Sequence, residues 1–261
     1  RGPPVLHKDF YLRNPEPVLQ CERYCWGNLE ATHPVLSRRT ADEVDRYCRE
    51  HGLLVETIKG RRRAPKPFQS FEETSFPKWV AELAYELFTS EARPFPAQAQ
   101  AWPCALSGMD LIVVAPTGSG KTLAYLLPAL VHIMAQPHLQ RGEGPIVTVL
   151  VPTRELAQQT NAVASRFCER TSGEDTIRTS AVFGGVLPDM QLPSPDPPHD
   201  GRWPELLVAT PGRLRFLLGS DKYLGSSGLS RTSYIVVDEA DLLLSPGSWL
   251  DQVRALLALG H

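Results

Sequence analysis

The sequence lacks the features that mark membrane-spanning and secreted proteins. No apolar run approaches the roughly 20 residues that a transmembrane helix needs, and no secretory signal peptide is visible. Since the chain opens with Arg1 and not Met, the sequence leaves open a targeting segment upstream. We therefore expect no membrane partner and a location in the nucleus or cytoplasm, with an organelle as the alternative if a presequence was removed.

Cysteine is too scarce and too irregularly spaced for a disulfide scaffold. The five cysteines are an odd number and form no C-x-x-C pair. Cys21 and Cys25, with His33 and Cys48 downstream, give only a weak indication of a zinc site. We expect reduced structural thiols in an intracellular protein.

A large charge of either sign is also missing, because 27 Lys+Arg face 29 Asp+Glu. Residues 1–67 carry 13 basic and 9 acidic side chains, whereas residues 68–261 carry 14 and 20. The triple arginine at 61–63 is explained as well by a solvated charge run as by a nucleic-acid contact. A polyanion would have to be held by a few placed groups, since a broad basic surface is lacking.

Proline is abundant, with 24 residues in 261, and the hydrophobic fraction of 42% suffices for a core. The length allows one large domain or two small ones. The prolines predict breaks and insertions in place of long uninterrupted helices. Residues 187–204 hold six prolines in 18 positions and predict a mobile surface loop.

Residues 1–67 predict a mostly irregular extension with one short helix. Thr40 and Glu43 have the spacing of a capping box, and Gly52 fits the end of a helix. This pattern predicts a helix around residues 40–51. The proline-lysine-proline run that closes the extension predicts an extended linker.

From residue 68 onward the sequence alternates between two periodicities. Apolar residues at helical spacing predict a helix between Pro77 and Phe88. Short apolar runs, each consistent with a buried parallel strand, are Leu111–Ala115, Ile146–Val151, Thr179–Phe183, Leu206–Ala209 and Tyr234–Val237. The alternation predicts an α/β domain over residues 68–261, with a parallel sheet flanked by helices.

The most specific motif follows the first of these runs and precedes another helical run, as a phosphate-binding loop requires. It reads Ala115-Pro116-Thr117-Gly118-Ser119-Gly120-Lys121-Thr122. Gly118 and Gly120 allow successive N–H groups to face a phosphate, and the helix start favours an anion. Lys121 would pair with the β- and γ-phosphates, and the Thr122 hydroxyl would ligate Mg²⁺. Ala115 stands where such loops usually begin with Gly.

An acidic element, Asp238-Glu239-Ala240-Asp241, follows the last predicted strand. Carboxylates at the carboxyl end of a strand lie on the ligand side of an open α/β sheet. Asp238 is placed to hold Mg²⁺, and Glu239 is the candidate for positioning or activating water. A solvated acidic turn is a weak alternative, because this element occurs together with the phosphate loop.

These two elements resemble the DEAD-box ATP-dependent RNA helicases, and further first-domain motifs of that family match in order. Pro152-Thr153-Arg154-Glu155-Leu156 resembles motif Ia, Gly184-Gly185 the double-glycine element, and Thr210-Pro211-Gly212-Arg213 motif Ib. Motifs Ia and Ib follow predicted strands and open helices, whose free N–H groups can bind phosphates. The resemblance implies sequence-independent binding of the RNA backbone by Pro152, Thr153, Arg154, Gly184, Gly185, Thr210, Pro211, Gly212 and Arg213.

The segment Pro94–Gln98 and the residues after it resemble the Q motif of the same family. A side-chain amide can donate and accept at once, so Gln98 is assigned to the adenine edge. Phe88 is the nearest upstream aromatic that could stack on the purine. The sequence departs from the family in the spacing of Phe88, and in Phe95 and Ala97, which replace a small polar and an aliphatic residue.

The resemblance implies a RecA-like P-loop NTPase domain that works with ATP and Mg²⁺. The extension, including Phe10-Tyr11, residues 37–47 and Pro65-Lys66-Pro67, resembles that of the Dbp2-like nuclear subfamily. The family's Ser-Ala-Thr motif and second RecA-like domain would lie beyond His261, and Asp241 would couple the two domains. We expect this segment to bind nucleotide but to hydrolyse it poorly alone, since an arginine supplied from elsewhere typically contributes about 10³–10⁵ in rate.

Two classes of function follow from these residues. The favoured one is an RNA-remodelling ATPase. The alternative is a non-enzymatic RNA-binding clamp or assembly factor in a large ribonucleoprotein particle, which the missing second half, the atypical Q motif and the proline-rich insertion motivate. A DNA-directed P-loop ATPase is disfavoured by the Asp-Glu-Ala-Asp and Pro-Thr-Arg-Glu-Leu sequences.

Overall fold

A computed structural model of the chain describes residues 34–57, 63–74, 76–88, 93–171, 176–192, 202–225, 228–245 and 249–257. The chain divides into two compact units, a helical unit within Lys8–Ala135 and a sheet unit within Gln136–His261. Several sequence features lie outside the described residues. They are the weak indication of zinc at Cys21, Cys25 and His33, most of the triple arginine, and the motif at Phe10-Tyr11. No helix in the described ranges is long and apolar enough to cross a bilayer.

The helical unit contains α3 (Pro34–Arg38), α4 (Ala41–Glu50), the 3₁₀ turn η2 (Phe71–Glu73), α5 (Lys78–Phe88), α6 (Pro96–Leu106) and α7 (Lys121–Met134). The predicted capping box is confirmed at α4. Thr40 N–H donates to Glu43 Oε2 at 2.7 Å, and Glu43 N–H donates to Thr40 Oγ1 at 3.3 Å. Gly52 adopts a left-handed φ of +62° just after the helix. Sequence and structure agree here because both caps use local contacts only.

Two prolines lie inside helices, which contradicts the expectation that the prolines break them. They are Pro103 in α6 and Pro128 in α7. Pro103 has no N–H to donate to the carbonyl of Ala99, four residues earlier. That carbonyl accepts instead from Phe68 N–H, at 2.9 Å. A segment outside the helix thus supplies the hydrogen bond that the proline removes.

Phe68 belongs to an extended segment, residues 63–70, that we name the strap. Gln100 Nε2 of α6 donates to Pro65 O at 2.8 Å, so the strap is held on α6 by a second hydrogen bond. On the other side, Arg39 donates to Pro67 O and to Glu73 Oε1, both at 2.6 Å. The predicted linker is therefore extended, but it is fastened along its length.

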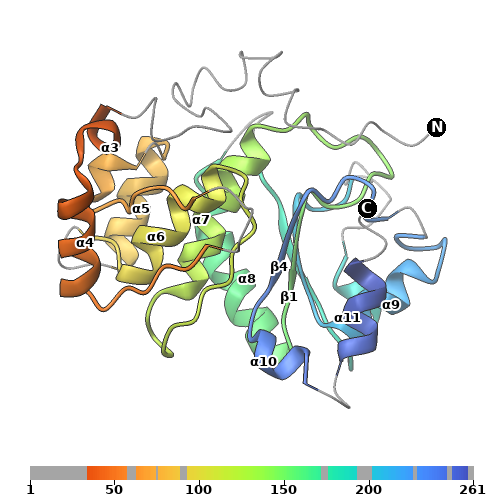
Figure 1. Ribbon diagram of the computed structural model, residues 1–261. Coiled ribbons are helices and arrows are strands. Elements are labelled where there is room, and N and C mark those ends of the chain that lie inside the picture. Colours follow the sequence, from red (N-terminus) through yellow and green to blue (C-terminus); the bar gives the residue numbers. More distant parts are fainter. Residues whose placement is uncertain are drawn as a thin grey trace. The chain divides into compact units, whose positions relative to one another are not determined.

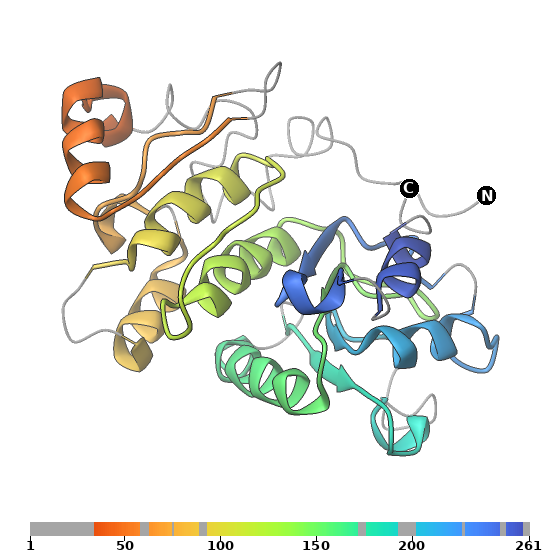
Figure 2. The same ribbon diagram turned by 60° about the horizontal axis from the view of Figure 1, so that its bottom comes forward.

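Trp102 of α6 packs against two aromatic rings and donates a hydrogen bond to α7. The Trp102 side chain is fully buried and its ring lies 5.4 Å from that of Phe71 and 5.1 Å from that of Phe76. Its Nε1–H donates to the carbonyl of Leu123 in α7 at 3.0 Å. Figure 2 shows α6 (yellow) and α7 (yellow-green) side by side. Most of the remaining side chains on α7 between Leu123 and Ile133 are buried, which makes it the central helix of this unit.

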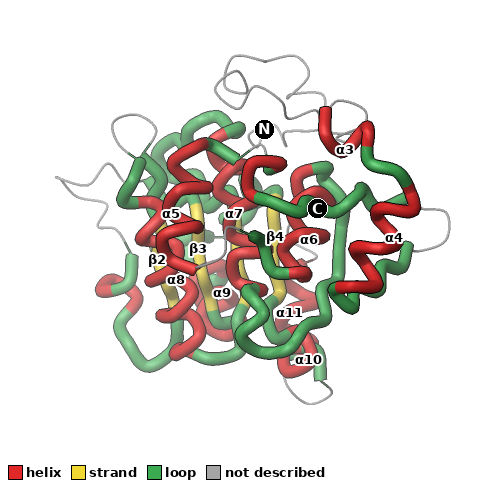
Figure 3. The backbone as a smooth tube through the Cα atoms, turned by 90° about the vertical axis from the view of Figure 1, so that its left-hand side faces the viewer, coloured by secondary structure: helices red, strands yellow, loops and turns green. Residues whose placement is uncertain are grey.

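The sheet unit contains four parallel strands in the order β2-β3-β1-β4. They are β1 (Val147–Leu150), β2 (Thr179–Val182), β3 (Leu206–Ala209) and β4 (Tyr234–Val237). The other elements are α8 (Arg154–Cys168), the 3₁₀ turn η4 (Pro188–Met190), α9 (Pro211–Leu218), α10 (Ala240–Leu243) and α11 (Leu250–Leu257). The tube view of Figure 3 shows the strands side by side. Four of the five predicted strands and the α/β class are confirmed.

Helices cover both faces of this sheet. In Figure 1, α8 lies on one side of the strands, and α9 and α11 lie on the other. Every residue of the central strands β1 and β3 is buried, which explains why they read as continuous apolar runs. The core under α9 and α11 includes Leu150, Val182, Leu207, Ala209, Leu214, Leu217, Leu243, Val253 and Leu256.

The predicted strand Leu111–Ala115 is wrong for this structure. These residues form no strand, and the side chains of Ile112 and Val114 are 91% and 94% exposed. An apolar, β-branched run has strand propensity, but a strand forms only where a neighbour completes its hydrogen-bond ladder. No such ladder to this segment is formed by the described residues.

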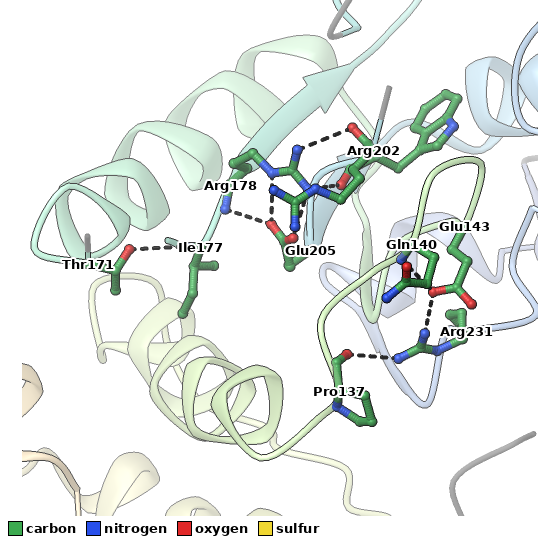
Figure 4. A network of polar contacts seen from close by, with 10 residues as sticks. Pro137, Gln140, Glu143, Thr171, Ile177, Arg178, Arg202, Glu205 and Arg231 are labelled. Carbon is green, nitrogen blue, oxygen red and sulfur yellow. Dashed lines mark hydrogen bonds and ion pairs between the residues drawn. The ribbon is translucent and has the colours of Figure 1, made fainter. Parts of the chain in front are cut away.

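The described ends of the proline-rich insertion are fixed by polar contacts, although the sequence predicted a mobile loop. Figure 4 shows Arg178 reaching the carbonyl of Arg202 and the carboxylate of Glu205, with an Nη2–Oε1 distance of 2.8 Å. At the other end, Ser180 Oγ donates to Gln191 O at 2.9 Å. Residues 193–201 lie outside the described residues.

Figure 4 shows a second arginine that contacts both a carboxylate and a backbone carbonyl. Arg231 donates to the carboxylate of Glu143 and to the carbonyl of Pro137, the latter at 2.9 Å. Arginine thus fixes loops in the sheet unit where the backbone ladders end.

Candidate nucleotide and RNA site

The phosphate loop, residues 115–122, ends at the start of α7. Gly118 and Gly120 have left-handed φ angles of +78° and +76°, and Gly120 is the N-cap of the helix. A Cβ atom at Gly120 would lie 2.3 Å from Gln98 Nε2 and 2.9 Å from Phe95 Cδ2. Gly120 is therefore required both by its backbone conformation and by the closeness of the Q motif.

The Lys121 side chain curls back over the loop. Its Nζ donates to the carbonyls of Ala115 and Pro116, at 2.6 Å and 2.7 Å. These contacts hold the ammonium beside the backbone that precedes the helix. Thr122 lies next to it in the first turn of α7 and is partly exposed.

Gln98 joins the start of α6 to the end of the phosphate loop. It is only 1% exposed; its Oε1 accepts from Phe95 N–H, and its Nε2 donates to Gly120 O, both at 3.0 Å. Phe88 is the last residue of α5, and its side chain lies outside what the structure describes. Sequence reasoning noted Phe95 only as a departure from the family, yet its ring lies against the loop glycine.

In the sheet unit, parallel pairing brings the other predicted residues to one edge. Leu150 pairs with Val237 and with Ala209, and Val182 also pairs with Ala209, so all four strands end at the same level. Each motif starts directly after its strand or one residue later. Their order along the edge is therefore double glycine, motif Ib, motif Ia and the acidic element.

The acidic element follows β4 through a strained turn. Asp238 Oδ1 accepts from Glu239 N–H at 2.9 Å. Glu239 has φ +48° and is the sole residue other than glycine with a positive φ in the described ranges. Such a conformation costs about 1–2 kcal/mol for a residue with a Cβ, and strained residues gather at functional sites. Asp241 lies exposed in the first turn of α10.

Motif Ia opens α8. Thr153 is the N-cap, and its Oγ1 accepts from Leu156 N–H at 3.2 Å. Arg154 Nε donates to Glu155 Oε1 at 2.6 Å. This hydrogen bond raises the pKa of Arg154 and lowers the pKa of Glu155. Pro152 lies between β1 and the N-cap residue Thr153.

Motif Ib opens α9. Thr210 is the N-cap without a side-chain cap, and Pro211 occupies the first turn. Arg213 Nη2 donates to Val186 O at 2.6 Å, which ties the segment after the double glycine to α9. Gly184 and Gly185 are exposed, and a Cβ at either would meet no atom within 4 Å. A Cβ at Gly212 would lie 3.4 Å from Trp249 Cζ3, so the tryptophan covers it.

The structure thus groups the predicted residues in two sets. Gln98, Gly120 and Lys121 come together in the helical unit. Motifs Ia and Ib, the double glycine and the acidic element come together in the sheet unit. Within the described ranges, no three His, Cys, Asp or Glu side chains gather as the ligands of a metal would.

Comparisons with known proteins identify the family. Residues 95–260 match the DEAD/DEAH box helicase family. The chain is 42% identical over 230 residues to the ATP-dependent RNA helicase DBP2 of Pyricularia oryzae. The aligned region covers 86% of this chain and 37% of that protein. It is 41% identical to the probable ATP-dependent RNA helicase DDX17 of Homo sapiens, covering 88% of this chain and 29% of the relative. The chain therefore spans well under half of these relatives.

Solved structures agree with this assignment. The RNA helicase Prp28 from Chaetomium thermophilum, bound to ADP, superimposes with a TM-score of 0.68 at 29% identity, over 86% of this chain and 50% of the other. The yeast splicing factor Prp28 gives a TM-score of 0.70 at 23% identity, which supports the fold alone. The resemblance to the N-terminal RecA-like domain of DEAD-box ATP-dependent RNA helicases, including the Dbp2-like proteins, is confirmed. The chain belongs to the DEAD/DEAH box helicase family.

Proposed function

We propose that this protein is an ATP-dependent RNA helicase or RNA-remodelling ATPase, of which residues 68–261 form the first RecA-like domain and residues 1–67 an extension. The observation that carries the proposal is the loop before α7. Two left-handed glycines and a lysine held over the loop carbonyls open a helix of 14 residues. This arrangement offers an anion both N–H groups and a positive charge.

The roles at the nucleotide follow from the chemistry of each side chain. Lys121 would leave the loop carbonyls for the β- and γ-phosphates, which are stronger acceptors because they are charged. Ser119 Oγ is buried and has no hydrogen-bond partner among the described residues, which suits a donor to a phosphate oxygen. Residues 115–118 would surround the phosphates with backbone groups.

Thr122 and Asp238 would hold Mg²⁺. A hydroxyl and a carboxylate oxygen are ligands that this ion prefers, and in nucleotide sites it keeps phosphate oxygens and waters as its other ligands. When bound, the ion would neutralise charge on the phosphates. Glu239 would orient the attacking water, and its strained backbone would fix the carboxylate relative to Asp238. Asp241 is proposed to couple this domain to a second RecA-like domain.

Gln98 is proposed to read adenine while it holds the loop. An amide can form two hydrogen bonds through its NH₂ and two through its oxygen. One of each is made to Gly120 and Phe95, which leaves one donor and one acceptor. The low exposure of Gln98 means that adenine must enter beside Phe95 or displace it. Stacking of Phe88 on the purine stays a proposal from the sequence.

RNA would bind along the carboxyl edge of the sheet unit. The residues proposed to contact its backbone are those of motif Ia (152–154), the double glycine (184–185) and motif Ib (210–213). Free N–H groups at the starts of α8 and α9 suit phosphates and carry no base information. Arg154 would exchange Glu155 for a phosphate, and the open glycines allow the sugar-phosphate chain a close approach.

ATP turnover would need a second RecA-like domain. We also propose that the protein assembles into a ribonucleoprotein particle and that it is located in the nucleus or cytoplasm.

The proposed function is tested by the ATPase rate of the full-length protein with and without RNA. Glu239→Gln should lower the RNA-stimulated rate by about 10²–10⁴, whereas the exposed Asp251→Asn on α11 should not change it. A wild-type protein that binds RNA tightly but shows no RNA-stimulated hydrolysis would instead support the clamp or assembly factor.

A further inference from the structure

Beyond motif Ib, aromatic and basic side chains continue along one face of α9, some exposed and some partly buried. Phe216 lies three residues after Arg213, a spacing that puts both on the same side of the helix. Phe216 is 55% exposed, and the Arg213 guanidinium carbon lies 5.6 Å from the centre of its ring. A large apolar side chain left open beside an arginine has no role in the core.

The same surface extends past the end of α9. The Tyr223 ring lies 6.0 Å from that of Phe216 at an interplanar angle of 43°. Lys222 Nζ lies 5.0 Å from the centre of the Tyr223 ring and 2.8 Å from Asp189 Oδ2. We name Arg213, Phe216, Lys222 and Tyr223 the α9 surface. The two aromatic rings lie next to each other, with Arg213 beside one and Lys222 beside the other.

Resting on the proposed function, we propose that the α9 surface binds single-stranded RNA that continues from motif Ib, with a base stacked on Phe216 and a phosphate at Lys222. Single strands present flat bases and charged phosphates in turn, and proteins bind them with aromatic rings and cations. Arg213 joins the two stretches because it belongs to both motif Ib and this surface.

The charges also favour RNA over an apolar protein partner. The Lys222–Asp189 pair is exposed on both sides, at 65% and 63% of its side chains. Such a pair is weak, so a phosphate can replace the carboxylate at little cost. The site would accept any base, since every base has a flat face to stack.

The test measures the affinity of the full-length protein for labelled oligouridylates, with Mg²⁺ and a non-hydrolysable ATP analogue. Phe216→Ala and Phe216→Leu should each weaken binding by about fivefold or more, as loss of one stacked base typically does. Phe216→Trp should restore binding. The leucine variant keeps an apolar side chain without a ring, so it separates stacking from simple apolar contact. Leu54→Ala, at another exposed apolar residue (84% exposed), should leave binding unchanged.

Lys222→Gln should reduce the slope of log affinity against log salt by about one. Equal binding by wild type, Phe216→Ala and Phe216→Leu would overturn this inference while leaving the proposed function intact. Failure of the wild type to bind any RNA would instead overturn the proposed function. Unchanged RNA affinity with loss of a co-purifying protein from Phe216→Ala would assign the surface to a protein partner and so contradict the proposal.

Discussion

In the helical unit, single side chains from distant segments hold the phosphate loop and the strap, whereas in the sheet unit repeated backbone bonds hold the motif residues in line. Gln98 Nε2 links the start of α6 to Gly120 O, and Arg39, between α3 and α4, links to Pro67 O and Glu73 Oε1. Along the sheet, four parallel strands end at the same level. The difference teaches that one substitution can loosen a site in the helical unit, while the sheet edge depends on many residues together.

The largest expected effect comes from breaking the buried ion pair of the helical unit. The side chains of Arg39 and Glu73 are only 8% and 14% exposed. Arg39→Ala would leave Glu73 as an unpaired buried charge, which typically costs about 3–5 kcal/mol. Urea unfolding should show this loss. Lys78→Ala is the matched control, because the Lys78–Glu82 pair is exposed and should change stability by less than about 0.5 kcal/mol. Similar losses of unfolding free energy in Arg39→Ala and Lys78→Ala would show that burial does not set the two ion pairs apart.

Gly120→Ala should have the next largest effect. The left-handed backbone costs alanine about 1–2 kcal/mol, and the overlap with Gln98 adds about 1–3 kcal/mol. ATP binding, measured by calorimetry, should also be lost. Gly142→Ala in the sheet unit is the control, since Gly142 has φ +81° but open space around it. Gly142→Ala should lose only the roughly 1–2 kcal/mol that a left-handed backbone costs alanine, and it should keep ATP binding.

A pH titration tests the buried histidine of α7. Burial lowers the pKa of His132 to about 4, below the roughly 6.5 of an unfolded chain. As the pH falls, the unfolded chain takes up a proton on His132 before the folded protein does. The free energy of unfolding is therefore unaffected by His132 above about pH 6.5 and decreases as the pH falls toward 4. The loss should reach about 3 kcal/mol. His132→Gln should flatten that part of the profile, and parallel profiles for the two proteins would show that His132 is not responsible.

The smallest effect concerns the strained residue of the sheet unit. Glu239→Gly should raise the free energy of unfolding by at most about 1 kcal/mol, because strain relief is partly offset by the freedom of glycine in the unfolded chain. RNA-stimulated ATP hydrolysis should be lost. Glu239→Gln keeps the backbone strain and should leave stability unchanged. A glycine variant no more stable than the glutamine variant would argue against stored strain.

Local patterns predicted much of this architecture. The capping box at Thr40 and Glu43, the helix from Lys78 to Phe88 and four of the strands depend on neighbours in the sequence or on runs of apolar residues. Residues 111–115 are apolar, like the four runs that form strands, but they form no strand. An apolar run becomes a strand only where a distant segment pairs with it. Pro103 reads as a helix breaker until Phe68 supplies the missing donor.

By itself, the sequence determined the family, the alternation of strands and helices, and the residues of the phosphate loop and acidic element, because motif spacing and periodicity are local properties. Only the tertiary structure decided that Gln98 and Phe95 crowd Gly120, that Glu239 is strained, and that Arg213 lies between Val186 and Phe216. Each of these depends on how close distant segments come or on a backbone angle, and residue order specifies those only through the packing of the whole unit.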